Sequence, residues 1–335
     1  MKKKSEFSSK KVSELKIKKR KKSEKVVQPK KNNDFFGNQE IKQDLQSFYN
    51  IEAKKYAETR KKFWHEEKAI LEEITPLFSS RHFDQMEKSI KQMEGDIHMD
   101  PHASFHSAQD DNIPMDSSAN ASEWQNRKLR VLEFWCWSGR FASLLNQNFH
   151  GQFDYVWIDL SDELLSYASK DNPNLTFFQW DITKLIKNFE QESFDLIVWT
   201  SSFQHIPTSK ERSFLMKNFY RLLNYDGILL MTNRSLSDWL IKKHRKIVMK
   251  AKILSWLRLN KSSSRDLMIP RTDEDWKIYE RFYHFFSLEE LKNLSKFAWL
   301  TIKSNTFIDW DGHFTDSEKI SRSSFFVATK TPIQW

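Results

Sequence analysis

The stretch Val131-Leu132-Glu133-Phe134-Trp135-Cys136-Trp137-Ser138-Gly139-Arg140 decides the fold. It begins as a buried strand over 129–134, and a helical pattern starts only a few residues later. A strand that turns directly into a helix is where α/β proteins bind nucleotide-like ligands, at the carboxyl edge of a parallel sheet. Such turns favour glycine, because the backbone approaches the ligand closely and often needs a positive φ. This turn has one glycine, and two tryptophans stand where further glycines are expected.

Read with glycine at 135 and 137, the stretch becomes VLEFGCGSGR. The same change at Trp157, Trp180 and Trp299 gives YVGIDLS, FQGD and FAGL. The composition agrees, because a chain of this length would hold about 23 glycines at average usage, whereas this one has 6 glycines beside 13 tryptophans. We hypothesise that the source reads the codon UGA as glycine, so that several tryptophans stand for glycine. The alternative is a degenerate chain that has lost the turn.

The corrected string VLEFGCGSGR resembles the first motif of the class I S-adenosyl-L-methionine (SAM)-dependent methyltransferases, and YVGIDLS resembles their second. An acid after the second strand, Asp159, can accept hydrogen bonds from a ribose diol. Asp181 after the third strand can accept from an adenine amino group, and Glu133 can face the ammonium group of the methionine part. A dinucleotide-binding Rossmann enzyme would instead have the motif G-x-G-x-x-G in this turn. The expected cofactor is therefore S-adenosyl-L-methionine. Its expected contacts are Glu133, Trp135, Trp137, Gly139, Asp159, Leu160, Asp181, Ile182 and Thr200.

Strands and helices alternate from residue 128 onward. Strands are expected at 129–134, 153–159, 175–179, 194–200 and 227–233, with helices at 140–148, 162–170, 183–189 and 209–223. Two short strands, at 300–306 and 323–330, should close the sheet as an edge hairpin. The fold class is thus α/β, a Rossmann-like methyltransferase fold with a mostly parallel seven-stranded sheet. An insertion at 236–275 follows the fifth strand, within a domain that spans 128–335.

The net charge of +9 comes from the beginning of the chain. Residues 1–33 carry 14 Lys and Arg against 3 Glu, and their composition predicts a disordered basic tail. Within the insertion, residues 241–261 carry eight Lys or Arg and no acid, so one basic amphipathic helix is expected over 236–261. Both segments favour tRNA as a partner through phosphate contacts. The alternatives are a solubilising tail and, for the helix, either packing on the core with a solvated basic face or binding at a membrane surface.

The segment 39–93 has helical periodicity and should form an N-terminal extension. Tyr49, Ala53, Tyr56 and Arg60 recur on one helix face. The next segment, 94–122, is rich in Asp, Ser, Asn and Pro and should be a mobile loop. Its histidines lack a rigid scaffold, so no metal site is expected.

A single cysteine, Cys136, excludes an internal disulfide and favours a reducing compartment. No apolar run reaches about 18 residues, and no signal-peptide pattern is present. We therefore expect a cytoplasmic protein that does not bind membranes.

Three further strings narrow the resemblance: TRKKFW at 59–64, DLMIP at 266–270 and RFYHFF at 281–286. They are similar to signatures of the tRNA (5-carboxymethyluridine) methyltransferase family, which methyl-esterifies the carboxymethyl group of a wobble uridine. The resemblance implies a tRNA-modifying transferase, with Arg60, Arg281 and His284 as candidate partners of the carboxylate and phosphates. His205 follows the fourth strand, where it could serve as a base or orient the substrate. The alternatives are a methyltransferase acting on a small acid or quinone and, if the tryptophans are real, a non-catalytic RNA-binding module.

Overall fold

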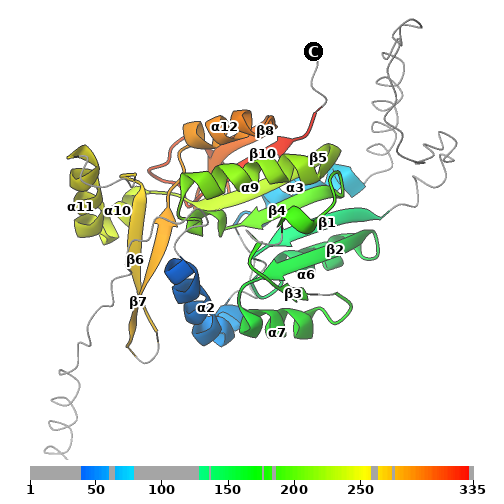
Figure 1. The fold of residues 1–335 in the computed structure, drawn as a ribbon, viewed down its shortest axis with the longest axis horizontal. Coiled ribbons are helices and arrows are strands. Elements are labelled where there is room, and N and C mark those ends of the chain that lie inside the picture. The colour runs from blue at the N-terminus through cyan, green and yellow to red at the C-terminus, as the bar shows by residue number, and fades with distance from the viewer. Residues whose placement is uncertain are drawn as a thin grey trace, which may run out of the picture.

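The computed structural model describes residues 39–59, 65–78, 128–135, 137–175, 177–182, 186–257, 263–273 and 276–331 (Figure 1). The expectations for the tail 1–33, the loop 94–122 and residues 79–93 of the N-terminal extension fall outside these residues. Arg60 and Cys136 also lie outside them.

One large sheet of eight strands forms the centre of the molecule. Across the sheet the strands are β3 (Phe177–Gln179), β2 (Phe153–Asp159), β1 (Leu129–Phe134), β4 (Phe194–Thr200), β5 (Leu223–Arg234), β10 (Ser323–Thr329), β8 (Thr301–Ile308) and β9 (Phe314–Thr315). The first five are mutually parallel, whereas β10, β8 and β9 join by antiparallel pairing. The prediction of a mostly parallel seven-stranded sheet is therefore wrong. The sheet is mixed, because β10 inserts antiparallel between β5 and β8 and the two-residue β9 adds an eighth strand.

Apolar side chains project from both faces of the parallel part of the sheet and pack into two cores. In β1, Leu132 and Phe134 point into one core, and Leu129 and Val131 point into the other, as the two-residue period of a strand requires. The first core is completed by α9 (Ser209–Leu222), α12 (Leu288–Phe297) and α2 (Gln39–Thr59); the second by α6 (Arg140–Phe149) and α3 (Glu67–Ile74). α7 (Asp162–Asp171) gives Leu164 to the first core and Leu165 to the second. The result is a three-layer α/β/α arrangement.

The insertion after β5 stands beside the sheet at one side of the molecule (Figure 1). It contains α10 (Asp238–Lys243), α11 (Arg245–Trp256), and an antiparallel hairpin of β6 (Asp266–Thr272) and β7 (Ile278–His284). The expected single basic helix is thus two helices that meet at His244. The hairpin was not predicted.

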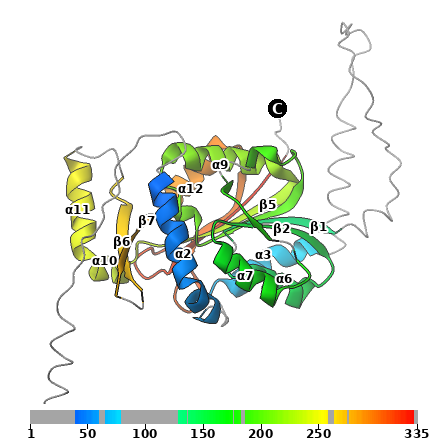
Figure 2. The same ribbon diagram turned by 60° about the horizontal axis from the view of Figure 1, so that its bottom comes forward.

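Helix α2 lies between the hairpin and α7, packing on both (Figure 2). Tyr49, Ala53 and Tyr56 are buried on the face of α2 that the sequence indicated. Among the described helices, none has both the length and the apolar composition that crossing a bilayer requires.

Candidate functional site

The turn between β1 and α6 has an unusual backbone. Trp135, Trp137 and Gly139 adopt left-handed conformations with φ of 52°, 57° and 75°. The N–H of Trp135 donates to the carbonyl of Ile158 at 2.7 Å, and the N–H of Trp137 donates to Oδ2 of Asp159 at 2.9 Å. The turn is thereby fixed against the end of β2, at the carboxyl edge of the sheet.

Two buried acids stand at this edge, each at the end of its strand. Asp159 also accepts the N–H of Ser161 at 2.9 Å, and burial raises its pKa to about 6, opposed by these backbone hydrogen bonds. Glu133 accepts from the Tyr155 hydroxyl at 3.0 Å. Burial raises the pKa of Glu133 well above its usual value, although this hydrogen bond acts in the opposite direction. The spacing of the two acids along the chain correctly indicated neighbouring strand ends.

The remaining predicted cofactor contacts surround the same edge. Oδ2 of Asp181 lies 3.4 Å from Nζ of Lys42 on α2. The carbonyl of Leu160 accepts from the Gln46 amide at 2.8 Å, and the carbonyl of Thr200 accepts from the Trp137 indole at 3.3 Å. Ile182 is fully buried in the first core, so its side chain serves as packing below the edge.

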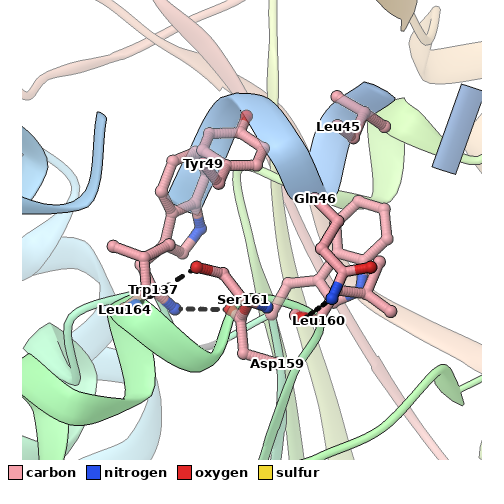
Figure 3. A pocket seen from close by; sticks show the side chains of 9 residues that line it. Leu45, Gln46, Tyr49, Trp137, Asp159, Leu160, Ser161 and Leu164 are labelled. Atoms are coloured by element: carbon pink, nitrogen blue, oxygen red, sulfur yellow. Dashed lines mark hydrogen bonds between the residues drawn. The ribbon is translucent and has the colours of Figure 1, made fainter. Parts of the chain in front are cut away.

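A small cavity lies between this edge and α2. Figure 3 shows Tyr49 reaching from α2 toward Trp137, and Gln46 reaching from α2 toward Leu160. Its volume is only about 20 Å³, which is close to the space of a single water. Much of the space is taken by indoles: Trp137 stacks on Tyr56 at 5.2 Å between ring centroids and meets Tyr49 edge-on at 4.9 Å. We call this space the edge cavity.

A second cavity, of about 230 Å³, opens on the other side of Trp137. Its lining includes one acid, Glu66, and a set of basic side chains: Arg234, Lys243, His244, Arg271, Arg281 and Arg322. Trp137 lines both spaces, so its indole is part of the wall between them. We call the second space the cationic pocket; its composition favours an anionic ligand.

Arg281 on β7 is the most buried cation of this pocket, with 7% of its surface exposed. Its guanidinium lies over the rings of Phe48 and Tyr283, at 4.9 and 5.2 Å, and Nη1 donates to the Tyr56 hydroxyl at 3.3 Å. Nε has no hydrogen-bond partner, and among the described residues no carboxylate lies within 4 Å of Arg281. A buried guanidinium without a counter-ion is unfavourable unless a ligand supplies the negative charge.

His205 lines neither of the two cavities. Burial and, to a lesser extent, the nearby Arg281 lower the pKa of His205 to about 3, so the ring is neutral at pH 7. Nδ1 is 2.7 Å from the carbonyl of Phe282; because a carbonyl only accepts, Nδ1 carries the proton. Nε2 is then the acceptor of the Tyr49 hydroxyl at 3.3 Å. His205 thus connects β7 to α2.

His284 is away from both cavities. Its Nδ1 lies 2.6 Å from Oδ1 of Asp266 and its Nε2 lies 2.7 Å from Oε1 of Glu290, while Arg212 approaches the same Glu290 at 3.8 Å. This buried network ties the hairpin to α9 and α12. The structure therefore brings Arg281, but not His284, to the pocket.

The sequence interpretation missed several residues of the site. Gln46 and Leu45 of α2 line the edge cavity, and Arg234, Arg271 and Arg322 line the cationic pocket. A signal existed for Arg234, which ends the buried strand β5 at the same sheet edge as Thr200. No comparable signal marked Arg271, because the hairpin that carries it was not recognised.

Comparison with known families gives a match over part of the chain. Residues 131–227 match the model of a methyltransferase domain family. These residues run from β1 into β5 and include the turn, Asp159 and Asp181. No curated protein matches the chain.

Many solved structures are similar in arrangement. A SAM-dependent methyltransferase from Methanosarcina mazei gives a TM-score of 0.47 at 18% identity, covering 61% of this chain and 93% of that one. A TehB-like SAM-dependent methyltransferase from Corynebacterium glutamicum gives 0.39 at 17% identity, covering 61% and 82%. DhpI in its SAH complex gives 0.46 at 12% identity, covering 88% and 100%.

Proposed function

We propose, from the match of residues 131–227 to a methyltransferase domain family, that the protein is a SAM-dependent methyltransferase that methyl-esterifies a carboxylate carried by the wobble uridine of a tRNA. The carboxylate group is supported by the contacts of Arg281. The tRNA is supported by the resemblance of residues 59–64, 266–270 and 281–286 to the tRNA (5-carboxymethyluridine) methyltransferases.

The observation that carries the proposal is the buried guanidinium of Arg281. Its planar set of donors matches the two oxygens of a carboxylate. An acceptor carboxylate paired with Arg281 would supply the missing counter-charge at the wall that the cationic pocket shares with the edge cavity. A carboxylate is already ionised at pH 7, so the reaction requires no base, in agreement with the position of His205, which lines neither cavity. The work of the protein is then to orient the acceptor.

The other cations suit the polyanionic part of such a substrate. Arg234, Arg271 and Arg322 line the cationic pocket and can contact phosphates. Beyond the pocket, Lys246, Lys250 and Lys252 are exposed on α11, which stands at the periphery of the molecule (Figure 2). We assign these lysines to contacts with the RNA backbone, where they act without regard to base sequence.

The edge cavity offers an acid to SAM but not the space that SAM needs. Asp159 lines the cavity and is placed for a ribose diol, whereas Glu133 does not line it, and a space of about 20 Å³ cannot hold a nucleoside.

The experiment is transfer of tritiated methyl groups from SAM to bulk tRNA by the protein isolated from its source. Label should enter tRNA and be released by mild alkali, because alkali hydrolyses a methyl ester. A methyl group bound to carbon or nitrogen is not released under these conditions. Replacing Lys246, Lys250 and Lys252 by Gln should raise KM for tRNA and flatten its salt dependence. Alkali-stable label would disprove ester formation, and transfer only to small acids would exclude tRNA.

The pKa of Asp159 gives a pH prediction for the protein with Trp135→Gly and Trp137→Gly. Below pH 6 the carboxyl becomes protonated and loses the negative charge that strengthens its hydrogen bonds from the ribose hydroxyls. The affinity for SAM should therefore fall about three- to tenfold from pH 7 to pH 5. Asp159→Asn should bind more weakly at pH 7 and lose this fall. Calorimetry at both pH values measures it. If the fall persists in Asp159→Asn, then Asp159 is not its source and Glu133 becomes the candidate.

A further inference from the structure

Helix α12 ends in a motif that normally contains glycine. The N–H of Leu300 donates to the carbonyl of Ser295 at 3.0 Å, and the N–H of Trp299 donates to the carbonyl of Lys296 at 3.2 Å. This pair of bonds defines a Schellman motif, whose residue after the C-cap is left-handed and usually glycine. Here that residue is Trp299, with φ of 60°.

The hairpin of β6 and β7 also places a left-handed tryptophan where glycine is usual, in a different motif. The N–H of Trp276 donates to the carbonyl of Asp273 at 3.3 Å, and the N–H of Asp273 donates to the carbonyl of Lys277 at 3.0 Å. Trp276 has φ of 64°. A left-handed residue after such a turn, just before the second strand, is the usual place of glycine in short hairpins. Trp276 also exposes 82% of its surface, so packing does not explain the residue.

Left-handed tryptophans are far too frequent in this chain for chance. Ten of the 13 tryptophans lie in the described residues, and four of them have positive φ. Only a few per cent of non-glycine residues adopt this conformation, mostly Asn and Asp, and a bulky residue there is an outlier. The four tryptophans lie in three unrelated motifs: the turn after β1, the hairpin and the end of α12.

The side chains support the same conclusion. The indole nitrogens of Trp135, Trp157 and Trp199 are buried without a hydrogen-bond partner, although buried indoles normally have one. A Cβ placed on Gly139 would lie 2.9 Å from the Trp157 ring, so this indole leaves no room for a side chain at the one glycine that the turn retains. The indoles of Trp135 and Trp137 line the edge cavity and occupy space that SAM needs.

From the backbone we infer that positions 135, 137, 276 and 299 are glycine in the native protein. A single cause, translation of one codon as glycine in the source, accounts for all four. The inference rests on backbone geometry and hydrogen bonds, so it does not depend on the acceptor proposed above.

Peptide mass spectrometry of the protein isolated from its source tests the inference. Trypsin should release residues 131–140, 272–277 and 297–303 as separate peptides. Compared with the mass calculated from the printed sequence, we expect the first peptide to be lighter by two tryptophan-to-glycine mass differences. Each of the other two peptides should be lighter by one. Tryptophan in any of the three peptides overturns the inference. Loss of tRNA methylation would leave this result unchanged, so the two proposals fail separately.

A matched pair of variants tests the backbone argument in the chain as written. Trp299 and Trp239 are both about half exposed, at 58% and 50%, and each lies near a lysine and an aromatic ring. Trp239 is inside α10, where glycine is unfavourable. Trp299→Gly should raise Tm by about 2–4 °C through relief of the left-handed backbone, and Trp239→Gly should lower it. A lower Tm for both variants would contradict the inference.

Discussion

Replacing both Trp135 and Trp137 by glycine is expected to strengthen SAM binding about a hundredfold or more relative to the chain as written. In that chain the cofactor must displace two packed indoles. Trp135 is 7% exposed, and Trp137 is held by Tyr49, Tyr56 and the carbonyl of Thr200. Undoing such burial costs about 1.5–3 kcal/mol for each large side chain. Two of them correspond to a factor of about 10² to 10⁴ in affinity.

Isothermal titration calorimetry measures the difference. The matched control is the variant with Trp276→Gly and Trp299→Gly, which also relieves two left-handed tryptophans but lies outside the edge cavity. This control should bind SAM as weakly as the chain as written. Equal affinity for all three proteins would show that the indoles do not obstruct the cofactor.

Arg281→Met in the protein with Trp135→Gly and Trp137→Gly is expected to reduce kcat/KM for the carboxylate acceptor by about thirtyfold to more than a thousandfold. Methionine keeps the apolar stem between Phe48 and Tyr283 but removes the charge. Loss of one partner from a buried, hydrogen-bonded ion pair costs about 2–5 kcal/mol. Because Arg281 has no counter-ion among the described residues, the same change should not lower Tm.

Arg271→Met is the matched control for this prediction. Arg271 lines the same pocket, but its side chain is 40% exposed and lies 3.6 Å from Glu52. The carboxylate of Glu52 is buried, and Lys55 lies 3.9 Å from it. A contact between the half-exposed Arg271 side chain and a substrate phosphate contributes about 0–1 kcal/mol, so kcat/KM should change less than about fivefold. If the two variants lose activity equally, or if Arg281→Met unfolds the protein, Arg281 is not the specific partner of the carboxylate.

The sequence predicted the strands of the parallel half of the sheet well. Strands β1, β2 and β4 occupy the expected residues, because continuous apolar runs between turns are a strong signal for buried parallel strands. Asp159 and Glu133 were correctly placed at the carboxyl edge for the same reason: the end of a buried strand fixes the position of its last polar residue.

The hairpin of β6 and β7 could not be predicted in this way. Polar residues interrupt its apolar pattern, since Arg281 and His284 are buried by stacking and by pairing rather than by hydrophobicity. The roles of His284 and Arg281 depend on that pairing. The sequence does not show that His284 pairs with two carboxylates. Nor does it show that Arg281 pairs with none among the described residues. Likewise, no local signal says that α2 crosses the sheet edge, because this packing joins segments over a hundred residues apart.

One helix serves both cavities: Tyr49 of α2 lines the edge cavity, and Tyr56, two turns further on, lines the cationic pocket. A rigid helix cannot shift at one turn without carrying the other, so the two ligands are thermodynamically linked. If methyl donor binding repositions α2 and changes the affinity for the acceptor by some factor, acceptor binding must change the affinity for the donor by the same factor. A ternary-complex titration performed in either order should therefore return a single cooperativity constant.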